Sequence, residues 1–281
     1  MKKQAFCIMA HKNPEQLNLL ISLLDYSMSD IYLHIDKKSN IKDEDIVHPK
    51  ISNLYFVPRN DIRWGDVSQV KTEIELYEAT QNSSQEYSFV HLLSGEDLPI
   101  KNIKEIIEYF DANPNTEFID CSDYPEQIKR LQYYWLFTRH MRGNILYKVI
   151  RHSAIALQKV LHIDRFKGKN IDFKYGSSWI SATNKAIKCI ISEYHKMEST
   201  FNYTVSGDEV YKQIILNKNG FTFSPKGNLR YLQFPPHSSS PIIFKTENYD
   251  EIMNSGCLFA RKFDNNIDAS IINKIVEHIK S

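Results

Sequence analysis

The first 120 residues alternate between short apolar runs and segments in which apolar side chains recur with helical spacing. The apolar runs have the length of buried strands and cover residues 4–10, 31–36, 54–57 and 87–93. Apolar positions repeat every three or four residues in 14–26, 68–81 and 103–110. This alternation predicts an α/β fold, in which a mostly parallel central sheet carries helices on both faces.

Polar residues follow the predicted strands, at the point where each strand ends. They are His11, Asp36, residues 64–66 and residues 94–97. The carboxyl ends of parallel strands share one edge of a sheet, so we expect these residues to border a ligand site. No G-x-G-x-x-G or Walker-type loop is present, which argues against a classical dinucleotide fold and a P-loop.

Composition narrows the class of partner. With 35 Lys and Arg against 34 Asp and Glu, the net charge of +1 gives no general attraction to nucleic acid, and no nucleic-acid partner is expected. The four cysteines are scattered without a C-x-x-C pair, so we expect reduced thiols and no zinc site. A length of 281 residues with only 9 Gly and 10 Pro favours one domain over 1–281. No apolar stretch reaches transmembrane length.

The second half of the chain contains further predicted elements. Helices are expected at residues 144–162, 184–196, 210–217, 248–254 and 267–279. Short strands are expected at residues 117–120, 175–181, 221–223 and 229–234.

Two adjacent carboxylates precede the helix predicted at 210–217. Ser206 with Glu209 three residues later is the pattern of a capping box, which would make this stretch a structural helix start. In the alternative interpretation Asp208 is the helix cap, and Glu209 faces a pocket where it takes a proton from a hydroxyl nucleophile.

Residues 129–174 are strongly basic and contain only two carboxylates, Asp164 and Asp172. The helix predicted at 144–162 is amphipathic, and its basic side chains lie mostly away from its apolar side. A solvated helix face is one interpretation. The other is a surface for anionic lipid headgroups or for a lipid-diphosphate acceptor, which would give peripheral contact with a membrane.

Six segments in the same order resemble one known family. They are residues 6–12, 31–38, 92–101, 176–179, 208–209 and 258–264. The segments Ser-Gly-Glu-Asp-Leu-Pro at 94–99 and Leu-Phe-Ala-Arg-Lys-Phe-Asp at 258–264 carry most of the likeness. The set resembles the Core-2/I-branching β-1,6-N-acetylglucosaminyltransferases and the related peptide O-xylosyltransferases, over nearly the whole chain.

This resemblance implies a GT-A-like nucleotide-diphospho-sugar transferase fold. It implies transfer of a sugar, GlcNAc first among the candidates, from a UDP-sugar to a hydroxyl of a glycan or lipid-linked acceptor. The resemblance also implies inversion at the anomeric carbon and independence of a divalent metal. Residues 1–120 would form the nucleotide-sugar-binding half, and residues 121–281 the acceptor-binding and catalytic half.

The resemblance also implies residue roles. Glu209 falls where the family has its catalytic base. Lys262, with Arg261 beside it, falls at a basic position that binds the donor diphosphate. The remaining donor-binding candidates are Ala10, His11 and Asp36, in segments that line the uridine pocket.

The chemistry agrees with these roles. A hydroxyl nucleophile loses a proton as the glycosidic bond forms, and a departing diphosphate gains charge that a lysine can meet. Asp36 would then hold the uracil or ribose and no metal. The literal Asp-x-Asp at residues 43–45 lies in a charged loop, which we interpret as solvated.

One position departs from the family pattern. Where animal members have a second basic residue, this sequence has Ser239. The second positive charge would then come from Arg261, Arg230 or His237. Alternatively, the diphosphate would be bound by the hydroxyl and N–H groups of residues 237–241.

The acceptor-binding candidates are Asp97, Arg130, Trp135 and Trp179. Trp135 would stack on a sugar ring or instead cap the core. Asp97 would contact sugar, together with Glu96, or instead stabilise the turn before Leu98.

The sequence is compatible with three functions. The first is the metal-independent transferase, cytoplasmic or peripheral on the inner face of the plasma membrane, since the sequence shows neither the disulfides nor the anchor of animal members. The second is a catalytically degenerate protein of the same fold that binds glycan or nucleotide. The third, a nucleotidyltransferase, would require a Gly-rich basic loop after the first strand, and His11-Lys12-Asn13-Pro14 is not one.

Overall fold

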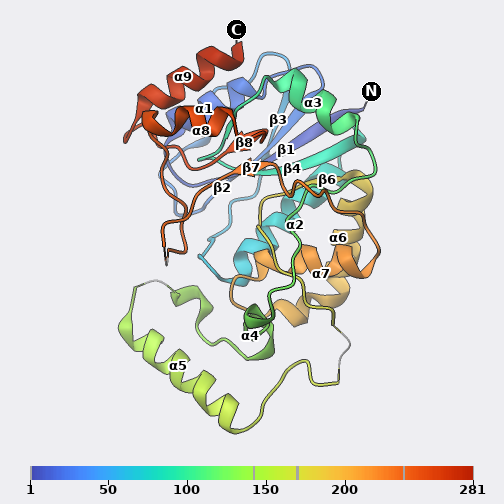
Figure 1. The fold of residues 1–281 in the computed structure, drawn as a ribbon, viewed down its shortest axis with the longest axis vertical. Helices are drawn as coiled ribbons and strands as arrows, with labels where there is room; N and C mark the ends of the chain where they lie inside the picture. Colours follow the sequence, from blue (N-terminus) through green and yellow to red (C-terminus); the bar gives the residue numbers. More distant parts are fainter. Residues whose placement is uncertain (1, 142, 169–170, 237, 281) are drawn as a thin grey trace.

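The computed structural model describes residues 2–141, 143–168, 171–236 and 238–280 (Figure 1). Within them, the largest sheet has the strand order β3-β2-β1-β4-β6. Its strands are β1 Lys3–Ala10, β2 Ser29–Ile35, β3 Asn53–Val57, β4 Tyr87–Ser94 and β6 Ser181–Thr183. The pairs β1–β2, β2–β3 and β1–β4 are parallel, and β6 runs antiparallel to β4. The predicted mostly parallel sheet is confirmed.

Helices cover both faces of this sheet, as the sequence predicts. The helices α2 Val67–Gln81, α6 Asn184–Phe201 and α7 Tyr211–Lys218 pack on one face, together with Cys7 of β1. The helices α1 Pro14–Leu23 and α3 Ile103–Asp111 pack on the other, against Phe6 and Ile8. Successive β1 side chains therefore supply two different cores, because side chains alternate across a strand.

A second, three-stranded sheet positions the C-terminal segment at the edge of the first. It has the order β5-β8-β7, with β5 Leu98–Pro99, β8 Phe259–Ala260 and β7 Arg230–Tyr231. The helices α8 Tyr249–Met253 and α9 Ala269–Lys280 cover it. The amide of Phe263 donates to the carbonyl of Glu96 at 3.0 Å, so the residues after β8 lie next to the turn that follows β4.

The basic region forms a separate lower part of the molecule (Figure 1). It contains α4 Lys129–Gln132 and α5 Ile145–Val160, with 3₁₀ turns η2 Pro125–Gln127 and η3 Thr138–His140. The predicted helix at 144–162 is confirmed, and α5 stands clear of the central sheet in this view.

Some predicted details differ. The strands predicted at residues 117–120 and 221–223 are not formed as strands. These residues make only isolated β-bridges, between Glu117 and Phe223 and between Phe118 and Ser181. In the predicted strand at 175–181, only the last residue enters β6. The turn η1 Asp43–Asp45 is exposed, in agreement with a solvated loop; the remaining short turns are η4 Gly207–Glu209 and η5 Thr246–Asn248.

Candidate active site

A cleft of about 550 Å³ lies at the carboxyl ends of β1, β2 and β4. One wall comes from the strand ends, with Ala10, His11, Asp36 and Glu96. The other walls come from distant parts of the chain, and the lining includes Trp64, Tyr175, Trp179, Asp208, Glu209, Ser239, Arg261 and Lys262. The structure thus brings together the predicted catalytic residue and the predicted donor-binding residues.

Neither predicted helix cap at 206–209 is present. Ser206 has left-handed backbone angles and its side chain makes no capping bond, while its amide donates to the carbonyl of Gly65 at 2.9 Å. Asp208 is buried and accepts hydrogen bonds from Ser178 and Gln69 instead. The capping box and the Asp208 cap were therefore wrong, because this stretch is a 3₁₀ turn held by tertiary contacts and α7 begins only at Tyr211.

Glu209 is held in the cleft by two neighbours. Its Oε2 atom forms an ion pair with Arg130 and accepts a hydrogen bond from the Tyr175 hydroxyl at 3.1 Å. Desolvation by burial raises the pKa of Glu209, and the Asp208 charge raises it further, while Arg130 lowers it. Burial and the Glu209 charge raise the pKa of Tyr175 to about 12, so this hydroxyl remains a hydrogen-bond donor.

The cations Arg261 and Lys262 border the same cleft. The Arg261 guanidinium lies 4.1 Å from the centre of the Trp179 ring, and its Nε atom is 3.4 Å from Asp97. Its buried Nη1 atom has no hydrogen-bond partner among the described residues. The amine of Lys262 lies 3.2 Å from Glu96, with 24% of the side chain exposed. An unsatisfied guanidinium beside a partly exposed amine is suited to an anionic ligand.

The predicted uridine segment lies at the ends of β1 and β2. Asp36 is buried and accepts hydrogen bonds from the backbone and amine of Lys38, at 2.8 and 2.9 Å. His11 also borders the cleft, where desolvation lowers its pKa. Ala10 packs closely against Gly95. A Cβ atom added at Gly95 would lie only 3.1 Å from the Cβ atom of Ala10.

The four acceptor-binding candidates are placed differently. Trp179 lines the cleft, and Arg130 reaches it through Glu209. Asp97 is buried away from the cleft lining, where it accepts a hydrogen bond from the Ser94 amide, the turn-stabilising contact. Trp135 donates its ring N–H to the Lys129 carbonyl at 3.0 Å and does not line the cleft.

Sequence reasoning missed Tyr175 and Ser178 as site residues. Ser178 belongs to the segment 176–179 that resembles the family, and Tyr175 directly precedes it, so this proximity was the available signal. Their contacts with Glu209 and Asp208 depend on the fold and carry no mark in the sequence.

The structure limits which residues can replace the second diphosphate-binding cation that this sequence lacks. Ser239 borders the cleft with Ser240 and Pro241. Arg230 is fully buried and donates to the carbonyls of Leu92 and Ile180, so it does not line the cleft. His237 lies outside the described residues.

The described residues contain no group of three or more His, Cys, Asp or Glu side chains arranged to hold a metal ion. All four cysteines are free thiols. None of the described helices combines the length and the apolar character that a bilayer span requires.

The fold and the cleft place this protein among the α/β proteins that bind ligands at the carboxyl ends of parallel strands. A sequence model of the Core-2/I-Branching enzyme family matches residues 4–251, and the chain belongs to that family. The family assignment made from the sequence is confirmed.

Individual relatives are distant. The chain is 22% identical over 225 residues to the probable beta-1,3-galactosyl-O-glycosyl-glycoprotein beta-1,6-N-acetylglucosaminyltransferase 7 of Homo sapiens. That match covers 76% of this chain and 49% of the human protein, so the chain spans about half the length of this relative. Among solved structures, 4-diphosphocytidyl-2C-methyl-D-erythritol synthase from Anaerococcus prevotii DSM 20548 is similar with a TM-score of 0.41 and 11% identity, covering 79% of this chain and 86% of that one.

Proposed function

We propose that this chain is an inverting, metal-independent glycosyltransferase of GT-A type. It transfers a sugar, with GlcNAc as the leading candidate, from a UDP-sugar to a hydroxyl of a glycan or lipid-linked acceptor. The observation that carries the proposal is that one cleft is bordered by the Glu209 carboxylate and by the cations Arg261 and Lys262.

In this proposal Glu209 is the general base. The acceptor hydroxyl gives its proton to the carboxylate while its oxygen bonds to the anomeric carbon of the donor. Arg130 and Tyr175 both contact the Oε2 atom of the carboxylate, so they orient the group and Oε1 is the atom that takes the proton. The raised pKa of Glu209 makes it a stronger base than an ordinary surface carboxylate.

Lys262 and Arg261 meet the charge on the leaving group. As the bond from the anomeric carbon to the diphosphate breaks, its electron pair stays on UDP, and nearby cations stabilise that charge. Arg261 supports the proposal most directly, because its buried Nη1 has no partner among the described residues. It thereby takes the place of the family's second cation, in the cleft that Ser239 also lines.

The uridine would occupy the ends of β1 and β2. Asp36 would accept from the uracil or ribose in this position, since its partner Lys38 already neutralises its charge. His11 and Ala10 complete this side of the cleft, and Trp179 offers an apolar ring to a sugar.

The test replaces Glu209→Gln and follows UDP released from a panel of UDP-sugars, with and without candidate acceptors. We expect a loss of roughly 10²-fold or more in turnover with UDP binding retained, because the substitution removes the base and keeps its size. Glu44→Gln, an exposed carboxylate outside the cleft, is the matched control. Turnover should persist in EDTA. UDP binding without turnover in the unmodified chain would instead identify a degenerate binding protein, and a manganese requirement would refute the role of Lys262.

A further inference from the structure

Helix α5 turns its apolar side to the solvent. Its exposed side chains include Ile145 at 71%, Val149 at 56%, Leu157 at 59% and Val160 at 73%. In an ordinary surface helix such residues face the core. Here the two most buried side chains of the helix are polar, since Arg151 and Gln158 are 4% and 8% exposed.

Specific polar contacts fix this orientation. Gln158 accepts a hydrogen bond from the Tyr134 amide at 2.8 Å and donates one to the Tyr134 carbonyl at 3.0 Å. On the same side of α5, the Tyr147 ring stacks on the His140 ring at 4.3 Å. Rotating the helix to bury its apolar side would break these contacts, so the exposed apolar face is a built feature of the fold.

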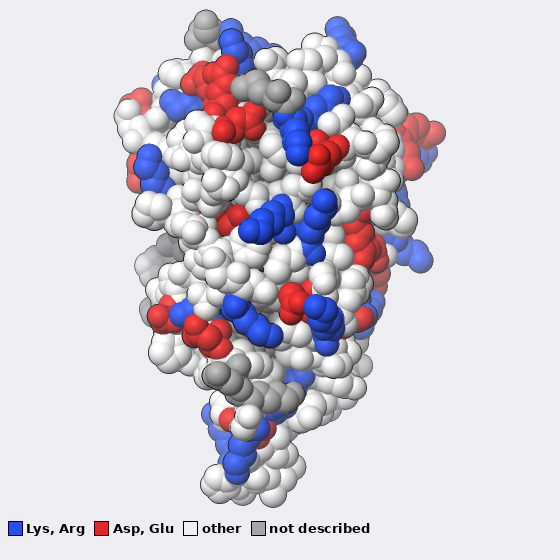
Figure 2. Space-filling model, turned by 90° about the vertical axis from the view of Figure 1, so that its right-hand side faces the viewer, with Lys and Arg blue, Asp and Glu red and all other residues white. Residues whose placement is uncertain are grey.

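Basic side chains run along one flank of the exposed apolar face. Lys148, His152 and Lys159 are spaced by four and seven residues, which places them in one row on a helix. Residues 141–163 contain no Asp or Glu. The lowest part of the molecule in Figure 2 is mainly uncharged, and the charged atoms just above it are mostly those of lysine and arginine, with a few acidic atoms among them.

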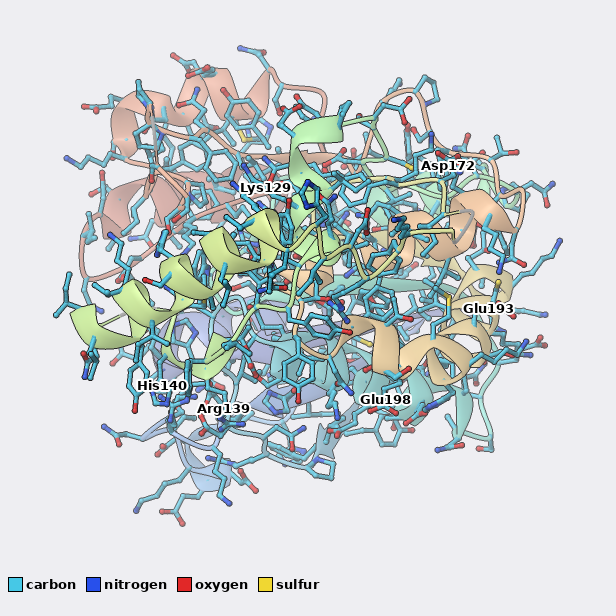
Figure 3. All side chains as sticks on the ribbon, turned by 90° about the horizontal axis from the view of Figure 1, so that it is seen from below. Lys129, Arg139, His140, Asp172, Glu193 and Glu198 are labelled. Carbon is cyan, nitrogen blue, oxygen red and sulfur yellow. The ribbon has the colours of Figure 1, made fainter. Side chains whose placement is uncertain are left out.

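The view from below shows the surroundings of α5 (Figure 3). Arg139 and His140 lie beside its N-terminal end, and the acidic Glu193 and Glu198 lie on α6, toward the right of this view. The face that α5 presents is therefore apolar at its centre and cationic at its margin.

We propose that α5 docks in the plane of an anionic lipid bilayer, with its apolar face among the acyl chains and Lys148 and Lys159 at the headgroups. An apolar helical face with flanking lysines matches this environment, since it gains from both burial and charge. A second copy of the chain matches less well, because the two helices would bring their lysines together without a carboxylate to pair with them. The proposal is independent of the transfer reaction.

The test measures binding of the whole chain to vesicles by co-sedimentation. The vesicles are phosphatidylcholine alone, or phosphatidylcholine with phosphatidylglycerol. The unmodified chain should bind the anionic vesicles, and binding should fall as salt is raised because salt screens the headgroup charge. Val149→Glu with Leu157→Glu should reduce binding by roughly tenfold or more, since the apolar face can no longer enter the bilayer.

The matched control is Val47→Glu with Ile51→Glu. These side chains are exposed at 66% and 62%, and the double substitution changes the net charge equally. It should bind as the unmodified chain does. Lys148→Gln with Lys159→Gln should lose roughly tenfold or more of the anionic-vesicle binding, whereas Lys42→Gln with Lys104→Gln should lose much less.

Two results would overturn the proposal. One is absence of vesicle binding by the unmodified chain. The other is equal binding by the α5 variant and its control while circular dichroism shows both folded. If sedimentation shows a dimer that only Val149→Glu with Leu157→Glu dissociates, and no vesicle binding, the face is a self-association surface and the membrane assignment is wrong.

Discussion

At the scale of single residues, the carboxylate of Glu209 lies between two opposing influences. Asp208 raises its pKa and Arg130 lowers it, so the two neighbours should shift the pH dependence of the reaction in opposite directions. Glu209 acts as a base only when deprotonated, and the acidic limb of kcat/KM reports its pKa in the free enzyme.

Arg130→Met should therefore move the acidic limb to higher pH, and Asp208→Asn should move it to lower pH. Measurement of kcat/KM from pH 4 to 9 in both variants checks the pair of signs, and the exposed Arg63→Met serves as a control. A common direction for both variants, or no shift in either, would contradict the assignment of Glu209 as the base.

Lys262 and Lys12 offer a matched comparison on the donor side. Both amines contact Glu96, at 3.2 and 3.0 Å, but only Lys262 borders the cleft. We expect Lys262→Ala to lower kcat by roughly 10²-fold, the scale for removing one group that stabilises transition-state charge. Lys12→Ala should leave kcat nearly unchanged.

Steady-state kinetics and UDP titration of both variants make this measurement. Similar losses in the two variants would mean that Lys262 acts through Glu96 and not on the diphosphate.

At the scale of elements, the turn at Gly176 joins two parts of the site. Its amide donates to the Glu209 carbonyl at 3.0 Å, and a Cβ at this position would lie 1.8 Å from the Asp120 carbonyl oxygen. Only glycine fits between these two backbone segments. The turn therefore fixes Tyr175 and Trp179 relative to Glu209.

Gly176→Ala should destabilise the fold by more than about 2 kcal/mol, because backbone must move to admit the methyl group. Gly220→Ala is the control, since its φ of +70° is strained for alanine but nothing lies within 4 Å, and it should cost only about 1 kcal/mol. Urea unfolding followed by circular dichroism measures both. Equal costs would show that the Asp120 segment yields easily.

Local pattern predicted the helices and strands better than it predicted helix ends and orientations. The periodicity at residues 144–162 gave α5, yet it would favour the apolar side facing the core, and Gln158 reverses this. Ser206 and Glu209 have capping-box spacing, but the contact of Ser206 with Gly65 and the pairing of Glu209 with Arg130 override it. Both outcomes depend on partners far away in the sequence.

At the scale of the whole molecule, a buried ion pair connects the two halves of the chain. Glu73 of α2 pairs with Lys212 of α7 and accepts a hydrogen bond from the Tyr211 hydroxyl at 2.8 Å. Both charged side chains are almost fully buried. Burial outweighs the lysine and raises the pKa of Glu73 to about 7 from the model-peptide value of 4.5.

The raised pKa gives a pH dependence of stability. A carboxyl whose pKa is higher in the folded state contributes stability that is complete below about pH 4.5 and is lost as the pH rises through about 7. Glu73→Gln removes this titration, so its stability relative to the unmodified chain should increase from pH 4.5 to 8 by up to roughly 3 kcal/mol.

Chemical denaturation of both proteins across this pH range measures the difference. Comparing the two cancels the opposite contribution of His34, whose pKa burial lowers to about 4. Glu198→Gln, an exposed carboxylate, should show no such trend. A pH-independent difference for Glu73→Gln would mean that the carboxylate stays ionised when buried beside Lys212.

The sequence by itself determined the α/β class, the position of most helices and strands, and the family. These depend on periodicity and on short local motifs such as residues 94–99 and 258–264, which can be recognised in the sequence without knowledge of the fold. Only the tertiary structure showed that Arg261 and Glu209 line the same cleft and that Arg230 lies outside it. Only the tertiary structure showed that the apolar side of α5 faces the solvent. The physical reason is that such contacts join residues dozens to hundreds of positions apart, and local propensity carries no information about which of them meet.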